Sequence, residues 1–390
     1  MKDKLARVNW ILFAAMIVLI AVGTVSIWSA GNARTELVFH GMWKNNLATA
    51  LFGLLLYTVL SFTDYRRLLS IAAIPGYVTA VVFLIAVLLV GSEQFGGRRW
   101  LWFFQPSEIS KLCVLSLLAY LFGDESSPIV RCRKSFVGML IASILIGFPS
   151  LLILAEPDLG TTLTLVPAAL LIIFVSGTWR KGLAVTAVLV GLAALFILGA
   201  VYEAEKPGVS PERKERIMKY VPLKPHQVKR IRVFLFPGED VTGAGYNLRQ
   251  AQISIGSGGF TGKGIGKGET NHLKYLPQAI SMNDFIFCVY AEETGYVGSL
   301  FLLVLFGALL LSGCYVAFIA GELSGQLLAL GVMMLVFAHV YVNIAMSIGL
   351  VPITGLPLPF ISSGRTFLIT VMCGLGLVQS VSIHREEYNR

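Results

Sequence analysis

Long runs of apolar residues follow one another along the 390-residue chain, separated by short polar segments. A helix needs about 20 mainly apolar residues to cross a hydrocarbon core of about 30 Å. Ten runs approach that length, at 8–29, 47–63, 70–91, 107–122, 136–154, 160–177, 182–202, 285–312, 326–350 and 366–383. This pattern predicts an all-α polytopic membrane protein with ten transmembrane helices.

One long polar connection interrupts the series between the seventh and eighth predicted helices. It covers residues 203–284. We therefore expect three parts: a membrane domain with helices 1–7 (1–202), a large extracytoplasmic loop (203–284) and a membrane domain with helices 8–10 (285–390).

Basic residues indicate the orientation of the chain. Lys and Arg gather before the first predicted helix and after the second, fourth, sixth and tenth, whereas the connection after the eighth, 313–325, has none. Because cytoplasmic loops carry an excess of Lys and Arg, both termini are predicted to be cytoplasmic. The large loop then lies outside. Loops beyond about 60 residues escape this rule, so the positive charge of the large loop does not contradict the orientation.

The large loop is strongly basic. Residues 203–283 contain thirteen Lys and Arg against seven Asp and Glu, in a chain whose net charge is +9. This balance favours an anionic substrate or contact with the anionic membrane surface. A solvated basic loop that contacts lipid headgroups is the simpler alternative.

Composition agrees with a membrane protein. Hydrophobic residues make up 56% of the chain and charged residues 14%, and the mean hydropathy is +0.75. Because soluble proteins carry about 25% charged residues, a soluble protein is excluded. The first run, 8–29, is too long for a cleavable signal peptide. Five cysteines without CxxC spacing indicate neither a disulfide framework nor a metal site.

An acidic residue stands where the eighth apolar run begins. Asp284 lies in the stretch YLPQAISMNDFIF, residues 275–287. A charged side chain at the centre of a membrane costs roughly 2.5–3.5 kcal/mol and usually marks a functional site. Glu292 and Glu293 follow about two turns deeper, and we expect them to pair within the helix bundle.

Two further polar segments adjoin predicted helices on the outer side. In GGRRWLWFFQPSEISK (96–111), Pro106 and Glu108 suit the first turn of a helix, and Lys111 follows Glu108 at a spacing that allows an ion pair. This segment is either a capped helix with an internal ion pair or a polar face on a cavity. In AEPDLGTT (155–162), Asp158 is placed to cap the next helix near Thr161.

Two glycine- or proline-rich segments also lie outside. GAGYNLRQAQISIGSGGFTGKGIGKG (243–268) can fold tightly and present backbone N–H groups to an oxyanion, or it can be a flexible linker. It lacks the glycine and Ser/Thr positions of a Walker A or GxGxxG motif. VPITGLPLPFISSG (351–364) is irregular backbone near the membrane, tolerated when it lines a cavity, or it is an ordinary loop. We expect the four outer segments, 96–111, 155–162, 203–284 and 351–364, to converge on one outward-facing cavity that contains Asp284.

Five motifs occur in order along the chain: GRRWLWFFQPSEISK, EPDLGTT, RIRVFLFPGEDVTGAGYNLRQAQISIGSGGFTGKG, LKYLPQAISMNDFIFCVYAEETGYVG and PITGLPLPFISSG. Together they resemble the SEDS family of RodA and FtsW proteins over essentially the whole chain. The resemblance implies a peptidoglycan glycosyltransferase that polymerises lipid II at the outer face of the bacterial cytoplasmic membrane. Such proteins work with a class B penicillin-binding protein, a transpeptidase that cross-links the glycan.

The resemblance also implies roles for particular residues. Asp284 holds the place of the essential aspartate of the family, so it is the candidate catalytic base. The substrate-binding positions carried over from the family motifs are Trp100, Gln105, Glu108, Lys111, Asp158, Arg230 and Lys263.

The reaction implied is an inverting displacement. A glucosamine 4-hydroxyl of lipid II attacks the muramyl anomeric carbon of the growing chain, and undecaprenyl pyrophosphate leaves. Such a step needs a base near the hydroxyl and positive charge near the phosphates, for which Lys111, Arg230 and Lys263 are candidates. A divalent cation, Mg²⁺ or Mn²⁺, is possible where carboxylates cluster. Membrane lipid is an expected partner and nucleic acid is not.

The chain departs from the family pattern at four positions. Phe236, Asn283, Ser363 and Arg365 stand where aspartate, threonine, tyrosine and glycine are usual. The glycine-dense segment and ITGLPLPF resemble RodA, which acts in cell elongation and shape maintenance, more than FtsW, which acts in division. A lipid II flippase and a non-catalytic scaffold for a transpeptidase are the alternatives from other functional classes.

Overall fold

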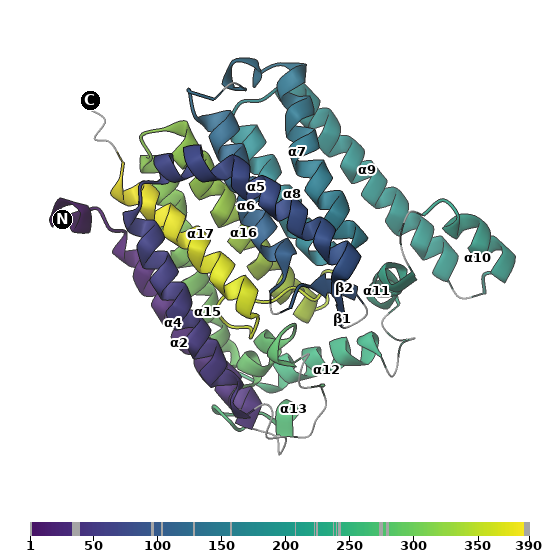
Figure 1. Ribbon diagram of the computed structural model, residues 1–390. Helices are drawn as coiled ribbons and strands as arrows, with labels where there is room; N and C mark the ends of the chain where they lie inside the picture. Colours follow the sequence, from purple (N-terminus) through teal and green to yellow (C-terminus); the bar gives the residue numbers. More distant parts are fainter. Residues whose placement is uncertain are drawn as a thin grey trace.

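Long apolar helices form the body of the molecule, whose computed structural model is shown in Figure 1. The structure describes residues 2–385 apart from 33–39, 95–96, 103, 128, 157, 207, 222, 224, 237, 239, 241–242, 273–275 and 278–280.

The N-terminal half contains most of the membrane helices. They are α1 (Lys2–Ala6), α2 (Trp10–Asn32), α4 (Met42–Phe62), α5 (Tyr65–Val90), α6 (Pro106–Gly123), α7 (Phe136–Ala155), α8 (Leu159–Val175) and α9 (Arg180–Glu205). Two short antiparallel strands, β1 (Ser92–Gln94) and β2 (Gly97–Trp100), precede α6, and a 3₁₀ turn, η1 (Val130–Cys132), precedes α7.

The C-terminal half begins with short helices outside the bundle and ends with three long ones. The short helices are α10 (Pro211–Met218), α11 (Pro225–Leu235), α12 (Ala244–Ser257) and α13 (Glu269–His272). The long ones are α15 (Ile286–Ile319), α16 (Leu323–Ser347) and α17 (Arg365–Ile383).

Each apolar run predicted from the sequence coincides with one of these helices. Among the described residues, nine helices are long and apolar enough to cross a membrane. The remaining run, 160–177, forms the shorter helix α8 of 17 residues. An all-α membrane fold is therefore confirmed, while the exact count of ten transmembrane helices stays a prediction.

Burial divides the helices into a central group and a peripheral one. The most apolar windows of α6, α16 and α17 are 72%, 72% and 89% buried, whereas that of α9 is only 6% buried. Glycines allow the central helices to approach closely: a Cβ at Gly376 of α17 would lie 2.9 Å from the backbone oxygen of Tyr57 in α4. Helices α6, α16 and α17 thus form the buried centre of the bundle, and α9 lies at its edge (Figure 1).

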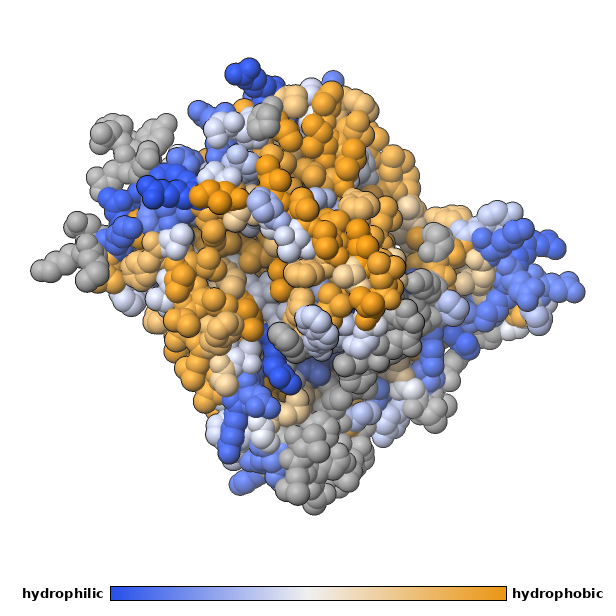
Figure 2. All heavy atoms as spheres, viewed as in Figure 1, coloured by the Kyte–Doolittle hydropathy of each residue, from blue (hydrophilic) through white to orange (hydrophobic). Residues whose placement is uncertain are grey.

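The surface agrees with a position in a membrane. Figure 2 shows hydrophobic side chains over the flanks of the bundle helices and hydrophilic side chains gathered toward α10 and near the chain ends. The two ends of the chain lie together, because Lys4 Nζ is 2.9 Å from Nε2 of His384. The predicted placement of both termini on one side of the bundle is consistent with this contact.

The segment predicted as a large loop is mostly helical where it is described. Helices α10 and α11 pack on the end of α9, where Val201 and Val228 are buried together with Val221 of the connection between α10 and α11. Helix α12 packs on α15, burying Leu248 and Ala251 against Phe285 and Cys288. The glycine-dense stretch is therefore ordered structure rather than a flexible linker.

Helix α15 is broken at Gly295, whose φ of 67° and ψ of −162° are not helical. The glycine-dense segment forms hydrogen bonds with the backbone groups on both sides of this break, and so pairs groups that the broken helix cannot pair itself. Lys263 and Gly264 donate backbone hydrogen bonds to the carbonyls of Glu292 and Glu293, and Tyr296 donates to Gly259 O, at 2.9–3.0 Å. Because buried backbone groups need partners in a membrane, these hydrogen bonds offset the cost of interrupting the helix. Asp284 thus precedes a short half-helix that ends at Gly295.

Candidate active site

Asp284 opens onto a small cavity at the end of the bundle that carries α11 and α12. The residue lies in the turn that precedes α15 and is partly exposed. The cavity measures about 140 Å³, and its lining comes from α11, α12, this turn and the segment after α16: Arg230, Val233, Ala244, Asn247, Asp284, Phe285 and Ile353. Within the described part of the chain, the Asp284 carboxylate accepts no hydrogen bond, so its oxygens remain available to a ligand.

Arg230 is the cation of this cavity. Helix α11 carries it, and its Nη1 donates a hydrogen bond of 2.9 Å to the carbonyl of Thr354. Gly355 lies between this arginine and Asp284: with φ of +76°, a Cβ there would be 3.5 Å from Asp284 Oδ2 and 3.9 Å from Arg230 Nη2. The absent side chain keeps the space in front of both groups open, and the positive φ suits glycine.

Electrostatics set the ionisation of the two groups. Burial raises the pKa of Asp284 to about 6, against the opposing charges of Arg230 and Arg99. Burial and the neighbouring Arg99 lower the pKa of Arg230, although an arginine stays charged at neutral pH. At pH 7 the cavity therefore holds a carboxylate of unusually high basicity beside a cation, which suits general-base chemistry.

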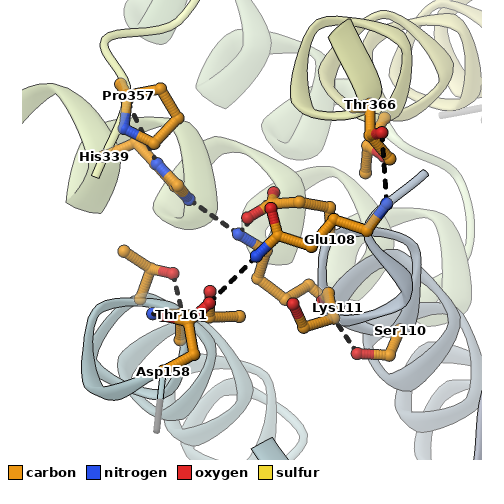
Figure 3. A network of polar contacts seen from close by, with 12 residues as sticks. Glu108, Ser110, Lys111, Asp158, Thr161, His339, Pro357 and Thr366 are labelled. Atoms are coloured by element: carbon orange, nitrogen blue, oxygen red, sulfur yellow. Dashed lines mark hydrogen bonds and ion pairs between the residues drawn. The ribbon is translucent and has the colours of Figure 1, made fainter. Parts of the chain in front are cut away.

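The motif that begins α6 forms a separate, buried network (Figure 3). Lys111 Nζ lies 2.8 Å from Glu108 Oε2, so the predicted ion pair is confirmed. The same nitrogen lies 2.9 Å from Nε2 of His339 in α16. Since lysine only donates, Nε2 accepts and the ring proton resides on Nδ1, which faces the carbonyl of Pro357 at 3.4 Å.

Gln105 and Asp158 join this network from the other side. Gln105 Nε2 donates to Asp158 Oδ2 at 3.0 Å, and the backbone N–H of Thr161 donates to Asp158 Oδ1 at 3.1 Å. The predicted capping role of Asp158 at the start of α8 is thereby confirmed. Figure 3 shows Lys111 of α6, Asp158 at the start of α8 and His339 of α16 pointing toward one another.

Full burial limits what Lys111 can contact. Its side chain is 0% exposed, and it is not among the residues that line the Asp284 cavity. The network it anchors extends through His339 to the backbone of the segment after α16. The predicted contact between Lys111 and substrate phosphates stays untested, and this geometry favours a supporting role instead.

Glu156 adds an unusual carboxyl group next to Asp158. It is 0% exposed, and neither carboxyl oxygen has a hydrogen-bond partner in the described residues. Burial and the negative charge of Asp158 raise its pKa to about 9, although Arg99 opposes the shift. Glu156 is therefore neutral at pH 7.

Lys263 lies against α15 rather than at the Asp284 cavity. Its Nζ is 2.9 Å from Glu292 Oε1 and 3.4 Å from Glu269 Oε2. Glu292 also accepts hydrogen bonds from Ser254 Oγ at 3.1 Å and from the backbone N–H groups of Glu269 and Thr270. Glu292 is therefore paired as expected, but these partners lie in the segment 203–284 and not in the helix bundle.

Glu293 is likewise paired, because Ser29 Oγ of α2 donates to its Oε1 at 2.5 Å. The substrate-binding role assigned to Lys263 by resemblance stays a prediction, and its two carboxylate contacts favour a structural role. Trp100, at the end of β2, is partly exposed and accepts a hydrogen bond from Ser92 Oγ at 3.3 Å through its carbonyl.

Two of the departures from the family pattern contact each other beside Asp284. Ser363 Oγ donates to Asn283 Oδ1 at 2.5 Å. Asn283 and Ser363 thus form one polar link between the turn and the segment after α16. Phe236 stacks on Tyr202, with ring centroids 5.6 Å apart, and Arg365 begins α17.

The structure therefore brings together part of the predicted convergence. Asp284, Arg230 and the segment 351–364 meet at the cavity, and Arg99 and Asp158 act on it through their charges. Sequence reasoning missed Arg99, Gly355, His339 and Asn343 as contributors. The last two carried a signal, since each is a polar residue inside an otherwise apolar run.

The described residues offer few ligands for a metal ion. In the described ranges, no group of three or more His, Cys, Asp or Glu side chains is arranged to hold a metal ion. The cavity offers one carboxylate, Asp284, with Arg230 beside it. This donor set does not fit a resident divalent cation, which prefers several oxygen ligands.

A family model matches almost the whole chain. It is the FtsW/RodA/SpoVE model, described as a cell cycle protein, and it covers residues 9–387. The chain is also 33% identical to the peptidoglycan glycosyltransferase MrdB of Escherichia coli strain K12, over 95% of this chain and 92% of that protein.

Solved structures resemble the fold. One is a chain of a structure described as "Structural coordination of polymerization and crosslinking by a peptidoglycan synthase complex". It has a TM-score of 0.73 and 30% identity, and covers 98% of this chain and 99% of that chain. Another is the Rod shape determining protein RodA of Thermus thermophilus, with a TM-score of 0.66, 28% identity, and coverage of 97% of this chain and 98% of that chain.

Proposed function

The chain belongs to the FtsW/RodA/SpoVE family, and on that premise we propose that it is a multi-pass membrane peptidoglycan glycosyltransferase that polymerises lipid II into glycan strands. The observation that carries this proposal is the Asp284 carboxylate, which opens onto a cavity beside Arg230 and accepts no hydrogen bond from the residues that the structure describes. The similarity to MrdB and to Thermus RodA supports a role in cell elongation and shape.

Asp284 acts as general base in the proposed reaction. The 4-hydroxyl of a lipid II glucosamine attacks the anomeric carbon of the muramyl residue that ends the growing chain. Its proton passes to the Asp284 carboxylate as the new glycosidic bond forms. The bond from the anomeric carbon to the diphosphate oxygen breaks, and undecaprenyl pyrophosphate leaves with the bonding electrons. Attack opposite the leaving group inverts the configuration. General-base catalysis of this kind typically contributes about 10²–10⁴ in rate.

Arg230 stabilises charge that develops in the same step. Its guanidinium is fixed through Thr354, and Gly355 leaves its other nitrogen accessible beside Asp284. A preorganised cation near a departing diphosphate lowers the barrier because it needs no reorganisation when the charge appears. Since the described lining of the cavity has a single carboxylate, we propose that any Mg²⁺ or Mn²⁺ enters with the substrate phosphates.

The proposed setting is the outer face of the bacterial cytoplasmic membrane, with both termini cytoplasmic. The excess of basic residues in the short connections on the side of the termini supports this orientation. We further propose a class B penicillin-binding protein as partner, supported by the similarity to a chain of a peptidoglycan synthase complex.

Labelled lipid II tests the proposal. The purified chain is incubated with it in detergent, with and without a cognate class B penicillin-binding protein, and the products are sized. Glycan strands are expected from the wild-type chain and none from an Asp284→Asn variant that stays folded. A wild-type chain that moves lipid II across vesicle membranes but forms no polymer would support a flippase and overturn the proposal.

A further inference from the structure

A buried side chain in α16 bridges the two backbone segments that shape the Asp284 cavity. Asn343 is 0% exposed. Its Nδ2 donates to the carbonyl of Asp284 at 2.9 Å and to the carbonyl of Leu356 at 2.7 Å. Both amide protons are thus used, one on each segment. The orientation of the amide follows from these partners, because a reversed amide would set its oxygen against two carbonyl oxygens.

The position of the Asp284 carboxylate depends on the backbone of the turn that carries it. The carboxylate has no hydrogen bond within the described residues, so the position of the side chain follows from its backbone. Three neighbouring carbonyls of the turn are held from outside: Ser363 N donates to Met282 O at 3.3 Å, Ser362 Oγ to Asn283 O at 2.6 Å, and Asn343 to Asp284 O. Among these, Asn343 holds the Asp284 peptide itself.

The facing segment is fixed in the same way. Its carbonyls accept from Arg230 at Thr354, from Asn343 at Leu356 and from His339 at Pro357. Gly355, which faces both Asp284 and Arg230, lies between the first two of these anchors. Asn343 and His339 are one helical turn apart in α16 and therefore share a face.

The amide oxygen of Asn343 indicates that this side chain does more than fill space in the core. Its Oδ1 is buried and has no partner in the described residues. A buried, half-satisfied amide is unfavourable compared with an apolar side chain of similar size unless its N–H groups are needed. The two hydrogen bonds supply that need.

We propose that Asn343 is a positioning residue of the glycosyltransferase reaction. It fixes the Asp284 peptide against Leu356 and so sets where the carboxylate stands relative to Arg230 and Gly355. This inference rests on the proposed function for its kinetic readout. Small displacements of a catalytic group can lower a rate by about a hundredfold, which defines the size of effect to look for.

The test replaces Asn343 by leucine, which has similar volume and no donor. Asn46→Leu is the matched control: Asn46 of α4 is also buried, at 2% exposure, and its amide has no hydrogen-bond partner among the described residues. Each variant is assayed on lipid II for kcat, KM and the pH profile. Hydrogen exchange is followed in peptides that cover 282–290 and 351–364.

Asn343→Leu should lower kcat by about 10–100-fold with KM within about twofold, and shift the acid limb of the pH profile. Exchange should accelerate in both peptides. Asn46→Leu should leave all four readouts at wild-type values. An Asn343→Leu variant with unchanged kcat and pH profile would overturn the proposal. So would unchanged exchange, and that readout remains decisive even if wild-type protein forms no polymer and the proposed function itself fails.

Discussion

Two carboxylates near the start of α15 have opposite environments. Asp284 faces a cavity and accepts no hydrogen bond in the described part of the chain, while burial raises its pKa to about 6. Glu292 is 1% exposed and is surrounded by Lys263, Ser254 and two backbone N–H groups. One carboxylate is left with free acceptor capacity, and the other has almost none.

The difference separates a reactive group from a structural one. A fully satisfied buried acid stabilises the fold because its hydrogen bonds offset the cost of removing it from water. An acid with unused lone pairs beside a cation gains nothing comparable for the fold, so its retention points to chemistry. The cations follow the same division: Arg230 faces the open cavity, and Lys263 is occupied by Glu292 and Glu269.

The largest expected difference is between the two cations, Arg230 at the cavity and Lys263 beside Glu292. Arg230→Gln should lower kcat by about 10²–10³-fold, because a preorganised charge near the leaving diphosphate is lost. Lys263→Gln is the matched change at the other carboxylate and should leave kcat per folded molecule within about twofold of wild type. Both are measured by polymerisation of labelled lipid II. Equal losses of kcat in the two variants would place Lys263 in the reaction and contradict the division into a reactive and a structural cation.

A smaller effect is expected from pH. Because the proposed base must be ionised and the pKa of Asp284 is about 6, the rate should be level above pH 7 and fall about tenfold per unit well below pH 6. The sign follows from protonation of the carboxylate. The pH dependence of kcat/KM measures it, and a rate that stays level down to pH 4 would contradict the role of Asp284.

The smallest expected effect tests how the glycine-dense segment packs against the break in α15. Gly262 has φ of +80°, and a Cβ there would lie 2.2 Å from the carbonyl oxygen of Glu293. Gly262→Ala should therefore cost about 1–3 kcal/mol of stability. Gly256→Ala is the control: it lies in α12 with nothing within 4 Å of a Cβ, and alanine there should stabilise by up to about 1 kcal/mol. Thermal unfolding in detergent measures both. A Gly262→Ala variant as stable as wild type would contradict the close packing of the glycine-dense segment on the α15 break.

Sequence alone predicted the parts of the fold that depend on local composition. Each apolar run became a helix because a membrane leaves the backbone few alternatives. The Glu108–Lys111 pair and the Asp158 cap were predictable because their partners are three residues away. Asp284 and Arg230 were identified through family motifs, and the cavity does bring them together.

Long-range partners could not be predicted in this way. Glu292 and Lys263 are 29 residues apart, and Asn343 reaches Asp284 across 59. The break at Gly295 had no signal either, since a glycine within an apolar run is common in membrane helices. These features depend on how the segments pack, which periodicity and composition do not specify.

The most direct test of the account measures polymerisation and thermal stability together in Asp284→Asn and Glu292→Gln. The first variant should lose polymerisation by at least about 10²-fold. Its Tm should stay the same or rise at pH 7, because a folded-state pKa raised above the usual aspartate value of 3.8 means that ionised Asp284 weakens the fold there. Glu292→Gln should cost about 2 kcal/mol of stability with activity per folded molecule near wild type. Polymerisation that survives in Asp284→Asn, or a Glu292→Gln variant that is stable but inactive, would contradict the account.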